Sequence, residues 1–519
     1  MSEKNYKDIT VTASDFEMVP MDGREHDKKL ESKPVGYFRD AFNRFCKNKS
    51  SVVAACIILF LLLYAIFVPM LCETTYSLAL TDTNYLNYSK LPPKIEALGV
   101  DGCSIVTVNE SDYYKLLGIG EETGLNPVVE IIKGPYDDPT AGPKKKNPTQ
   151  YYDLKVDNYY NLGMMYLTIS EAEYQKIQAW QNENKIQVIY PAITDAKQSD
   201  ANVWYKANKK GAPTMSKVDK DGDGYLDFTN IYRTTTPSDT TYNSLRVPGD
   251  TNPDKPYSYA RVTGTSSAKG FVVRVSKYNY FQYRYGFEPA FVFGTNARGQ
   301  DIFTRLAAGA RFSFMLAIGI SAINLFLGAI YGAIQGYYGG AIDLCMDRFA
   351  DILSGVPFMV VTTLFQLHLS KHVGPSTALL FAFVLTGWIG MAARVRMQFY
   401  RFKGQEYILA ARTLGARDSR LMFKHIFPNS LGTIITGSVL AIPGVIFSES
   451  SLTYLGIVNL ESSTETSVGT MLANGKDYLS TYPFIILFPA LFISLLMISF
   501  NLFGNGLRDA FNPSLRGNE

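Results

Sequence analysis

The segment Glu406-Tyr-Ile-Leu-Ala-Ala-Arg-Thr-Leu-Gly415, which continues through Lys424-His-Ile-Phe-Pro-Asn429, indicates the fold of the chain more clearly than any other. It is polar and basic, and it lies between two strongly apolar stretches. A basic loop between two membrane spans is expected on the cytoplasmic side of the membrane. The sequence therefore predicts a membrane protein that presents this segment to the cytoplasm.

The apolar stretches predict an all-α bundle of six transmembrane helices. A helix of about 20 apolar residues crosses the hydrocarbon core of a bilayer, and residues 51–71 form such a run. The other predicted spans are 312–334, 352–369, 378–393, 431–455 and 484–503. Basic residues gather before residue 51 and in the 394–430 loop, so both chain ends are expected in the cytoplasm. The net charge of only +3 argues against a nucleic-acid partner.

Two features of the predicted spans concern packing and buried charge. Glycines recur every fourth residue near the end of the second span, which predicts close approach of another helix. These glycines are Gly328, Gly332, Gly336 and Gly340. Glu449 lies inside the fifth span, where an acidic residue indicates a functional role. It either faces a solute path or a partner subunit, or it makes a structural hydrogen bond where Pro443 and Gly444 interrupt the helix.

Outside the spans, the chain divides into a tail, an interfacial helix and a large polar block. Residues 1–34 carry no periodic pattern and predict a disordered cytoplasmic tail, and residues 35–71 combine an interfacial helix with the first span. Residues 72–289 hold no apolar run of spanning length, so they are expected outside the cell. A capping box beginning at Ser170 and runs of β-branched residues predict an α+β domain there.

The polar block contains one candidate metal site and one candidate disulfide. The segment 219–227 matches the spacing of an EF-hand calcium loop, although Asn230 replaces the usual final glutamate and predicts weak binding. The alternative is a solvated acidic turn. The expected ligands are Asp219, Asp221, Asp223, Tyr225 and Asp227. Cys72 and Cys103 either form a disulfide in the oxidising outer compartment or remain two separate thiols.

The basic loop itself predicts two short helices. Tyr407, Ala410, Ala411 and Leu414 recur at helical spacing and are expected on one face of a helix over 404–414. Gly415 is well placed to end this helix with a left-handed residue. A second helix is expected over 418–425, ending before Pro428.

Several segments, in matching order, resemble the C-type membrane subunit of bacterial dipeptide/oligopeptide ABC importers. The resemblance covers about residues 35–71 and 293–515. The segments are Phe293-Gly-Thr-Asn-Ala-Arg-Gly-Gln-Asp301, Tyr337-Tyr-Gly-Gly340, the loop 406–429, Glu449-Ser-Ser-Leu-Thr-Tyr-Leu-Gly456 and Phe500-Asn-Leu-Phe-Gly-Asn-Gly-Leu-Arg-Asp509. Three departures stand out. Leu409 precedes Ala410-Ala411 where the family usually has glutamate, and Asn296 and Gln300 stand where the family often has aspartate and arginine. Family members also usually have a much shorter segment in place of 72–289.

The resemblance implies a type I ABC importer permease fold, with a permease core over 290–515 and the α+β domain inserted between helices 1 and 2. It implies no catalytic residue and no intrinsic cofactor, because ATP and Mg²⁺ bind partner subunits. The implied contact with an ATPase involves Glu406, Ala410, Ala411, Arg412 and Gly415. The implied partners are a homologous second permease, two cytoplasmic ATP-binding subunits, an extracellular peptide-binding lipoprotein and the lipid bilayer.

We therefore expect a multi-pass protein of the bacterial cytoplasmic membrane that imports peptides at the expense of ATP hydrolysed by its partners. The alternative is a calcium-stabilised extracellular receptor or docking protein, for which the helical bundle serves only as an anchor.

Overall fold

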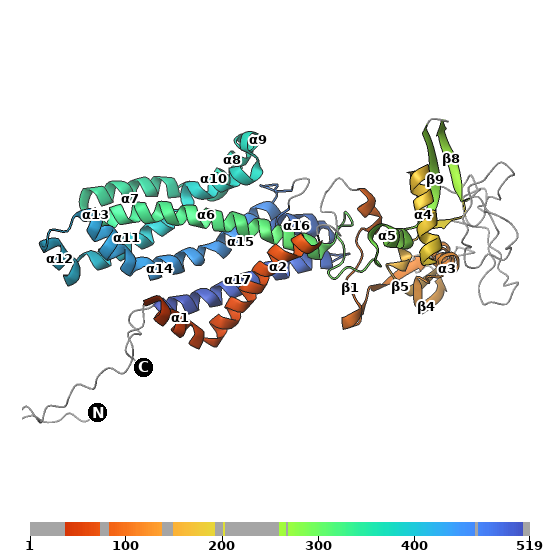
Figure 1. Cartoon of the computed structure of the whole chain (residues 1–519), viewed down its shortest axis with the longest axis horizontal. Helices are drawn as coiled ribbons and strands as arrows, with labels where there is room; N and C mark the ends of the chain where they lie inside the picture. Colours follow the sequence, from red (N-terminus) through yellow and green to blue (C-terminus); the bar gives the residue numbers. More distant parts are fainter. Residues whose placement is uncertain are drawn as a thin grey trace, which may run out of the picture.

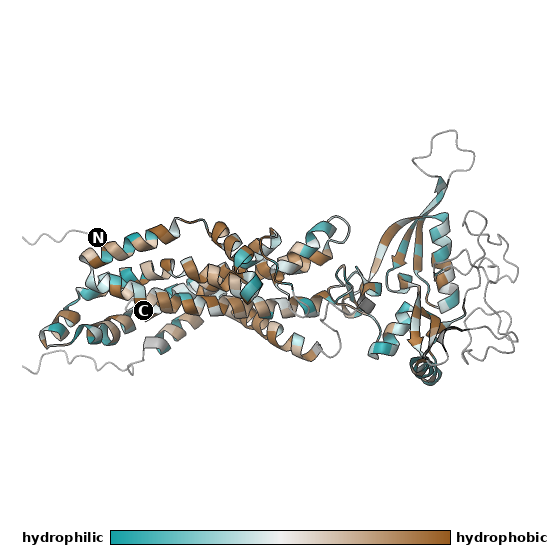
Figure 2. Cartoon of the chain, turned by 90° about the horizontal axis from the view of Figure 1, so that it is seen from above, coloured by the Kyte–Doolittle hydropathy of each residue, from teal (hydrophilic) through white to brown (hydrophobic). Residues whose placement is uncertain are grey.

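The computed structural model describes residues 37–72, 83–137, 149–192, 201–202, 259–265, 268–461 and 466–511. A helical bundle and an α+β part follow each other end to end along the long axis of the molecule (Figure 1). Hydrophobic residues are concentrated along the helices of the bundle (Figure 2). The predicted tail 1–34 and the 219–227 loop lie outside the described residues.

In the part of the chain that the structure describes, the bundle consists of sixteen helical elements. They are α1 (Tyr37–Lys47), α2 (Lys49–Cys72), α6 (Ile302–Tyr338), α7 (Gly340–Ser354), α8 (Phe358–His368), α9 (Ser370–Val373), α10 (Pro375–Gly387), α11 (Ile389–Lys403), α12 (Glu406–Thr413), α13 (Asp418–Arg420), the π-helix η7 (Leu421–Ile426), α14 (Phe427–Val439), α15 (Ala441–Tyr454), α16 (Val468–Gly475), η8 (Lys476–Tyr478) and α17 (Phe484–Phe511). Among the described residues, five helical segments are long and apolar enough to cross a membrane. A sixth is added if the bent pair α7–α8 counts as one span.

The third predicted span is interrupted at Pro357, as the sequence predicted. We expected a span over 352–369 that Pro357 either kinks or begins, and α7 ends at Ser354 while α8 starts at Phe358 with a bend of 69° between them. Pro357 lies directly before α8. Proline has no N–H to donate and disfavours a helical residue before it, which explains why the chain turns here.

The helical segment after the basic loop is longer than the sequence predicted. We expected a stop before Pro428, but α13, η7 and α14 follow one another, with Pro428 in the first turn of α14. A π-helix shifts the hydrogen-bond register by one residue. The shift occurs just before the proline, where the missing N–H would otherwise disturb the helix. The later interruption falls at Leu440, between α14 and α15, and not at Pro443.

The glycine row packs α6 against α11, as the spacing predicted. A Cβ added at Gly328 or Gly336 would press on the backbone of α11, and one at Gly332 would collide with the carbonyl oxygen of Ala392. Because glycine has no side chain, these three positions of α6 let the backbones of the two helices approach closely. Gly340 does not belong to this contact, because it lies at the start of α7 with no atom within 4 Å of an added Cβ.

The α+β part lies between α2 and α6 in the sequence. Its elements are η4 (Thr83–Tyr88), β1 (Lys94–Ile95), η5 (Glu96–Leu98), β2 (Val100–Asp101), β3 (Cys103–Asn109), α3 (Glu110–Thr123), β4 (Val128–Asp137), β5 (Gln150–Asp157), η6 (Tyr160–Leu162), β6 (Met164–Ser170), α4 (Glu171–Asn184), β7 (Ile189–Tyr190), β8 (Ala260–Thr265), β9 (Ala268–Ser276) and α5 (Lys277–Tyr285). One sheet has the order β3-β5-β4, and another has the order β6-β9-β7 with β8 also paired to β9. The predicted cap at Ser170 is confirmed, because its side chain accepts a hydrogen bond from the Glu173 N–H at 3.2 Å.

A buried ion pair joins the halves of the α+β part. Arg274 of β9 donates from both terminal nitrogens to Glu122 of α3, at 2.5 and 2.6 Å. Both side chains are almost completely buried. Removing one partner of such a pair leaves an uncompensated charge and costs about 3–5 kcal/mol.

Two chain segments, 83–94 and 286–296, connect the α+β part to the bundle and are here called the connector. They are hydrogen bonded to each other: Lys90 N–H donates to the Asn296 carbonyl at 3.0 Å, and Thr295 N–H donates to the Leu91 carbonyl at 2.9 Å. The Phe293 ring stacks on Phe488 of α17 at 4.1 Å between centroids. The connector is therefore fixed both within itself and to the bundle.

The glycine contact yields a direct test of the bundle. Gly332→Ala should lower the melting temperature of the purified protein, because overpacking a tight contact costs about 1–3 kcal/mol. The matched control is Gly319→Ala in the same helix, where an added Cβ has nothing within 4 Å. Thermal unfolding in detergent measures both variants. Equal melting temperatures for the two would contradict the close packing of α6 on α11.

Candidate functional site

The α12 helix occupies the tip of the bundle farthest from the α+β part (Figure 1). Ile408 anchors it, because this side chain is fully buried and packs in a cluster with Phe399 and Leu421. Glu406 lies in the first turn of α12, and both Glu406 and Ala410 are exposed. The helix thus rests on the bundle through one face and leaves the other face exposed.

The predicted apolar face of α12 is only partly correct. Tyr407, Ala410 and Leu414 are exposed, but Ala411 is half-buried and packs into the same cluster as Ile408. Residues 408 and 411 are three apart and share the inner face of the helix. Leu414 is 88% exposed and Leu409 is 47% exposed, which leaves an apolar outer surface on this short helix.

Gly415 ends α12 as the sequence predicted. Its φ angle is +81°, in the left-handed region that favours glycine. The Gly415 N–H donates to the Arg412 carbonyl at 3.0 Å, and the Ala416 N–H donates to the Ala411 carbonyl at 3.1 Å. These bonds satisfy carbonyl groups that a helix end otherwise leaves without a donor.

Arg412 links α12 to the long helix α6. Its guanidinium donates to the hydroxyl oxygen of Tyr337 at 3.2 Å, and the Tyr337 hydroxyl donates to the Asp418 carboxylate at 2.5 Å. Tyr337 lies in the last turn of α6, so this chain of bonds connects α12, α6 and α13. The sequence pattern placed Arg412 in the loop but did not indicate its partner.

Glu449 is buried in the bundle among hydroxyl groups. It accepts hydrogen bonds from Ser313 of α6 at 3.1 Å and from Thr453 at 3.3 Å. These contacts join α15 to α6 near the end of the bundle that carries the α+β part. The geometry supports the hydrogen-bonding alternative over an open position on a solute path.

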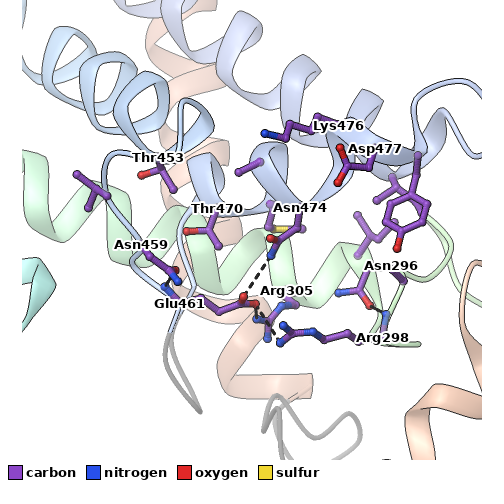
Figure 3. A pocket seen from close by; sticks show the side chains of 18 residues that line it. Asn296, Arg298, Arg305, Thr453, Asn459, Glu461, Thr470, Asn474, Lys476 and Asp477 are labelled. Carbon is purple, nitrogen blue, oxygen red and sulfur yellow. Dashed lines mark hydrogen bonds and ion pairs between the residues drawn. The ribbon is translucent and has the colours of Figure 1, made fainter. Parts of the chain in front are cut away.

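A cavity of about 540 Å³ lies at that same end of the bundle (Figure 3). We call it the Glu461 cavity. Glu461 accepts hydrogen bonds from Arg305 at 3.0 Å, from Arg298 at 3.4 Å and from Asn474 at 3.3 Å. Lys476 and Asp477 of η8 line the same space.

Sequence analysis did not identify the Glu461 cavity. Arg305 and Glu461 are 156 residues apart, and no local pattern predicts that they meet. The local signals were two segments of the family resemblance, 293–301 and 449–456, which gave no role to their side chains.

Cys103 is a free cysteine in the structure. Burial and the neighbouring Asp101 carboxylate raise the pKa of its thiol to about 11, which disfavours the reactive thiolate. The choice between a Cys72–Cys103 disulfide and two separate thiols stays a prediction. The side chain of Cys72 lies outside the described residues.

No metal site is evident in the part of the chain that the structure describes, since no group of three metal-binding side chains comes together there. The predicted calcium ligands Asp219, Asp221, Asp223, Tyr225 and Asp227 all lie outside the described residues.

Comparison with protein families gives two matches. The family described as "Binding-protein-dependent transport system inner membrane component" matches residues 325–517. The family described as "N-terminal TM domain of oligopeptide transport permease C" matches residues 36–93. Both matches include membrane helices of the bundle, and the first includes α12.

Among curated proteins, the chain is similar to oligopeptide and dipeptide permeases. It is 43% identical over 224 residues to the oligopeptide transport system permease protein OppC of Bacillus subtilis, covering 43% of this chain and 72% of that protein. It is 40% identical over 225 residues to the dipeptide transport system permease protein DppC of the same organism, covering 43% and 69%. It is 35% identical over 230 residues to OppC of Escherichia coli, covering 44% and 74%.

Among solved structures, a chain of the MetNI methionine ABC transporter in an inward-facing conformation is similar at 14% identity and a TM-score of 0.33. The similarity covers 40% of this chain and 96% of that one, and we draw nothing further from it. The curated relatives and the family matches are sufficient to assign the family of this chain. The chain belongs to the binding-protein-dependent transport system inner membrane components, as an ABC importer permease subunit of the oligopeptide permease C type.

Proposed function

We propose that this chain moves dipeptides and oligopeptides across the bacterial cytoplasmic membrane, driven by ATP hydrolysis on separate partner subunits. The observation that carries the proposal is α12, a short helix that is anchored by Ile408 and presents an exposed apolar surface at the tip of the bundle. The peptide class follows the names of the curated relatives, which are oligopeptide and dipeptide permeases.

The proposed orientation puts α12 and both chain ends in the cytoplasm and the insertion 72–289 outside. The charge distribution supports it, because basic residues gather toward the α12 end of the bundle. They include Arg396, Arg401 and Lys403 of α11. The α+β part lies at the opposite end of the bundle (Figure 1). The opposite orientation would leave the basic segment on the outer surface.

In the proposed mechanism, a partner ATPase holds the exposed face of α12, and movement of the ATPase is passed to the bundle. Ile408 transmits it through packing, and Arg412 transmits it through Tyr337 to α6. Because α6 has 37 residues, its axis is about 55 Å long and reaches the Glu461 cavity at its other end. A rigid helix of this length can couple the two sides of a membrane by rigid-body motion.

The proposed assembly contains a homologous second permease, two cytoplasmic ATP-binding subunits and an extracellular peptide-binding lipoprotein, all within or beside the lipid bilayer. We also propose that the 219–227 loop lies outside the cell and holds a structural Ca²⁺. The chain is a permease subunit, and ATP hydrolysis is carried by separate subunits.

We further propose that the α+β part docks the peptide-binding protein. The connector supports this role. The α+β part must be fixed to the bundle if it is to position a partner protein above the transport path, and the connector fixes it there. Exposed apolar side chains on β3 and β4, including Ile105 and Ile131, offer a contact surface. A purely receptor-like protein would not need the exposed α12 at the opposite end.

Leu414→Asp tests the contact of α12 with the ATPase. The side chain is almost fully exposed, so the substitution should leave folding intact while placing a charge in an apolar contact. We expect peptide uptake and peptide-stimulated ATP hydrolysis to fall at least about tenfold, as for loss of a hot-spot residue. Leu98→Asp, at another exposed leucine far from α12, is the matched control and should behave like the wild type. Normal uptake with Leu414→Asp would exclude this contact.

Gly415→Ala tests the end of α12 without adding charge. The left-handed conformation costs a non-glycine residue about 1 kcal/mol, which corresponds to roughly fivefold more frequent opening of the helix end. Hydrogen exchange of amides in 410–416 should become faster, and less peptide should be transported per ATP. Gly404→Ala is the control, because Gly404 has a φ of −93° and space for a Cβ. Unchanged exchange at 410–416 would contradict the described cap.

Site-specific crosslinking tests docking by the α+β part. A photoreactive residue in place of Ile105 should crosslink to the peptide-binding protein, and one in place of Phe423 should crosslink to an ATPase, because both positions are exposed at opposite ends of the molecule. The crosslinked partners are identified by mass spectrometry. If Ile105 yields no binding protein while Phe423 yields an ATPase, the docking role through this sheet is wrong and the transport role stands.

A further inference from the structure

We propose that the Glu461 cavity is a subsite for the C-terminal carboxylate of the transported peptide. The inference rests on the proposed function, and it adds the chemical group that the permease recognises. The cavity is formed where the start of α6, the segment 453–461, α16 and η8 meet (Figure 3). Its volume of about 540 Å³ is within the range of small-molecule binding sites.

The charges in the cavity are not balanced. Glu461 is shared between the guanidinium groups of Arg305 and Arg298, at 3.0 and 3.4 Å. Lys476 and Asp477 add one charge of each sign to the lining. Among the described lining residues, three cations therefore face two anions, a surplus of one positive charge.

Arg305 and Arg298 differ in how firmly they are held. The Arg305 side chain is 3% exposed, so its pairing with Glu461 is a fixed part of the wall. The Arg298 side chain is 49% exposed and makes the longer contact. Arg298 is therefore the guanidinium that can turn toward a ligand while Arg305 continues to hold Glu461.

The surplus charge and the shape of its donors favour a carboxylate. A single negative charge restores the balance, whereas a phosphate with about two negative charges would exceed it. The guanidinium group presents two parallel N–H donors that match both oxygens of a carboxylate. Lys476 also lines the cavity, and neither Lys476 nor Asp477 forms an ion pair within the described residues.

The position of the cavity also suits a transported substrate. Arg305 and Ile302 belong to the first turn of α6, and the last turn of the same helix contacts Arg412. Movement of α12 would therefore move a wall of the cavity. A ligand held there would be released when α6 shifts.

The experiment compares two forms of one peptide, with a free C-terminal carboxylate or with a C-terminal amide. The complete importer, with its binding protein and ATPases, is reconstituted in proteoliposomes, and initial uptake is measured below saturation. Arg298→Gln and Lys476→Gln are tested beside wild type. Lys371→Gln, at an exposed lysine of α9 outside the cavity, is the matched control. The binding protein is the same throughout, so its own preference cancels between variants.

We expect the ratio of acid uptake to amide uptake to fall about two- to fivefold in Arg298→Gln and Lys476→Gln, as for loss of a partly exposed charge pair. Lys371→Gln should keep the wild-type ratio. An unchanged ratio in both cavity variants, or an equal loss of acid and amide uptake, would overturn the carboxylate subsite while leaving peptide import intact. If wild type imports neither form, the peptide function itself is wrong.

Discussion

Close packing between α6 and α11 is the constraint on which the rest of the bundle depends. Three glycines of α6 leave no side chain between the two backbones, so the position of one helix fixes that of the other. The chain leaves α11 directly into α12, and α12 returns to α6 through Arg412 and Tyr337. The glycine contact thus sets where α12 lies relative to α6, the longest of the described helices.

Much of this architecture can be predicted from sequence, for reasons that are physical. A bilayer requires long apolar helices and basic cytoplasmic loops, so composition alone locates most spans and the basic segment. Gly415 was predictable because only a few residue types accept its backbone conformation. The positions of proline predicted helix breaks less reliably. Pro357 coincides with a sharp bend, whereas the helix continues through Pro428 because the π-helix before it changes the hydrogen-bond register.

Contacts between distant residues could not be predicted. Nothing near Arg305 indicates that Glu461 is its partner, and nothing near Arg412 indicates Tyr337. The spacing of Tyr407, Ala410, Ala411 and Leu414 suggested one apolar face, but the bundle selects Ile408 and Ala411 as the inner pair. Leu409, which departs from the family pattern, is half-exposed on the outer surface. The departure from glutamate therefore makes α12 more apolar without disturbing its anchor.

The ion pair between Arg274 and Glu122 has a consequence for the medium in which the α+β part works. Dissolved ions screen interactions between exposed charges, but they hardly reach a pair from which water is excluded. The exposed pair of Lys155 and Asp101 should weaken as salt rises, whereas the buried pair should not. The two halves of the α+β part should therefore stay joined in dilute and in saline surroundings alike.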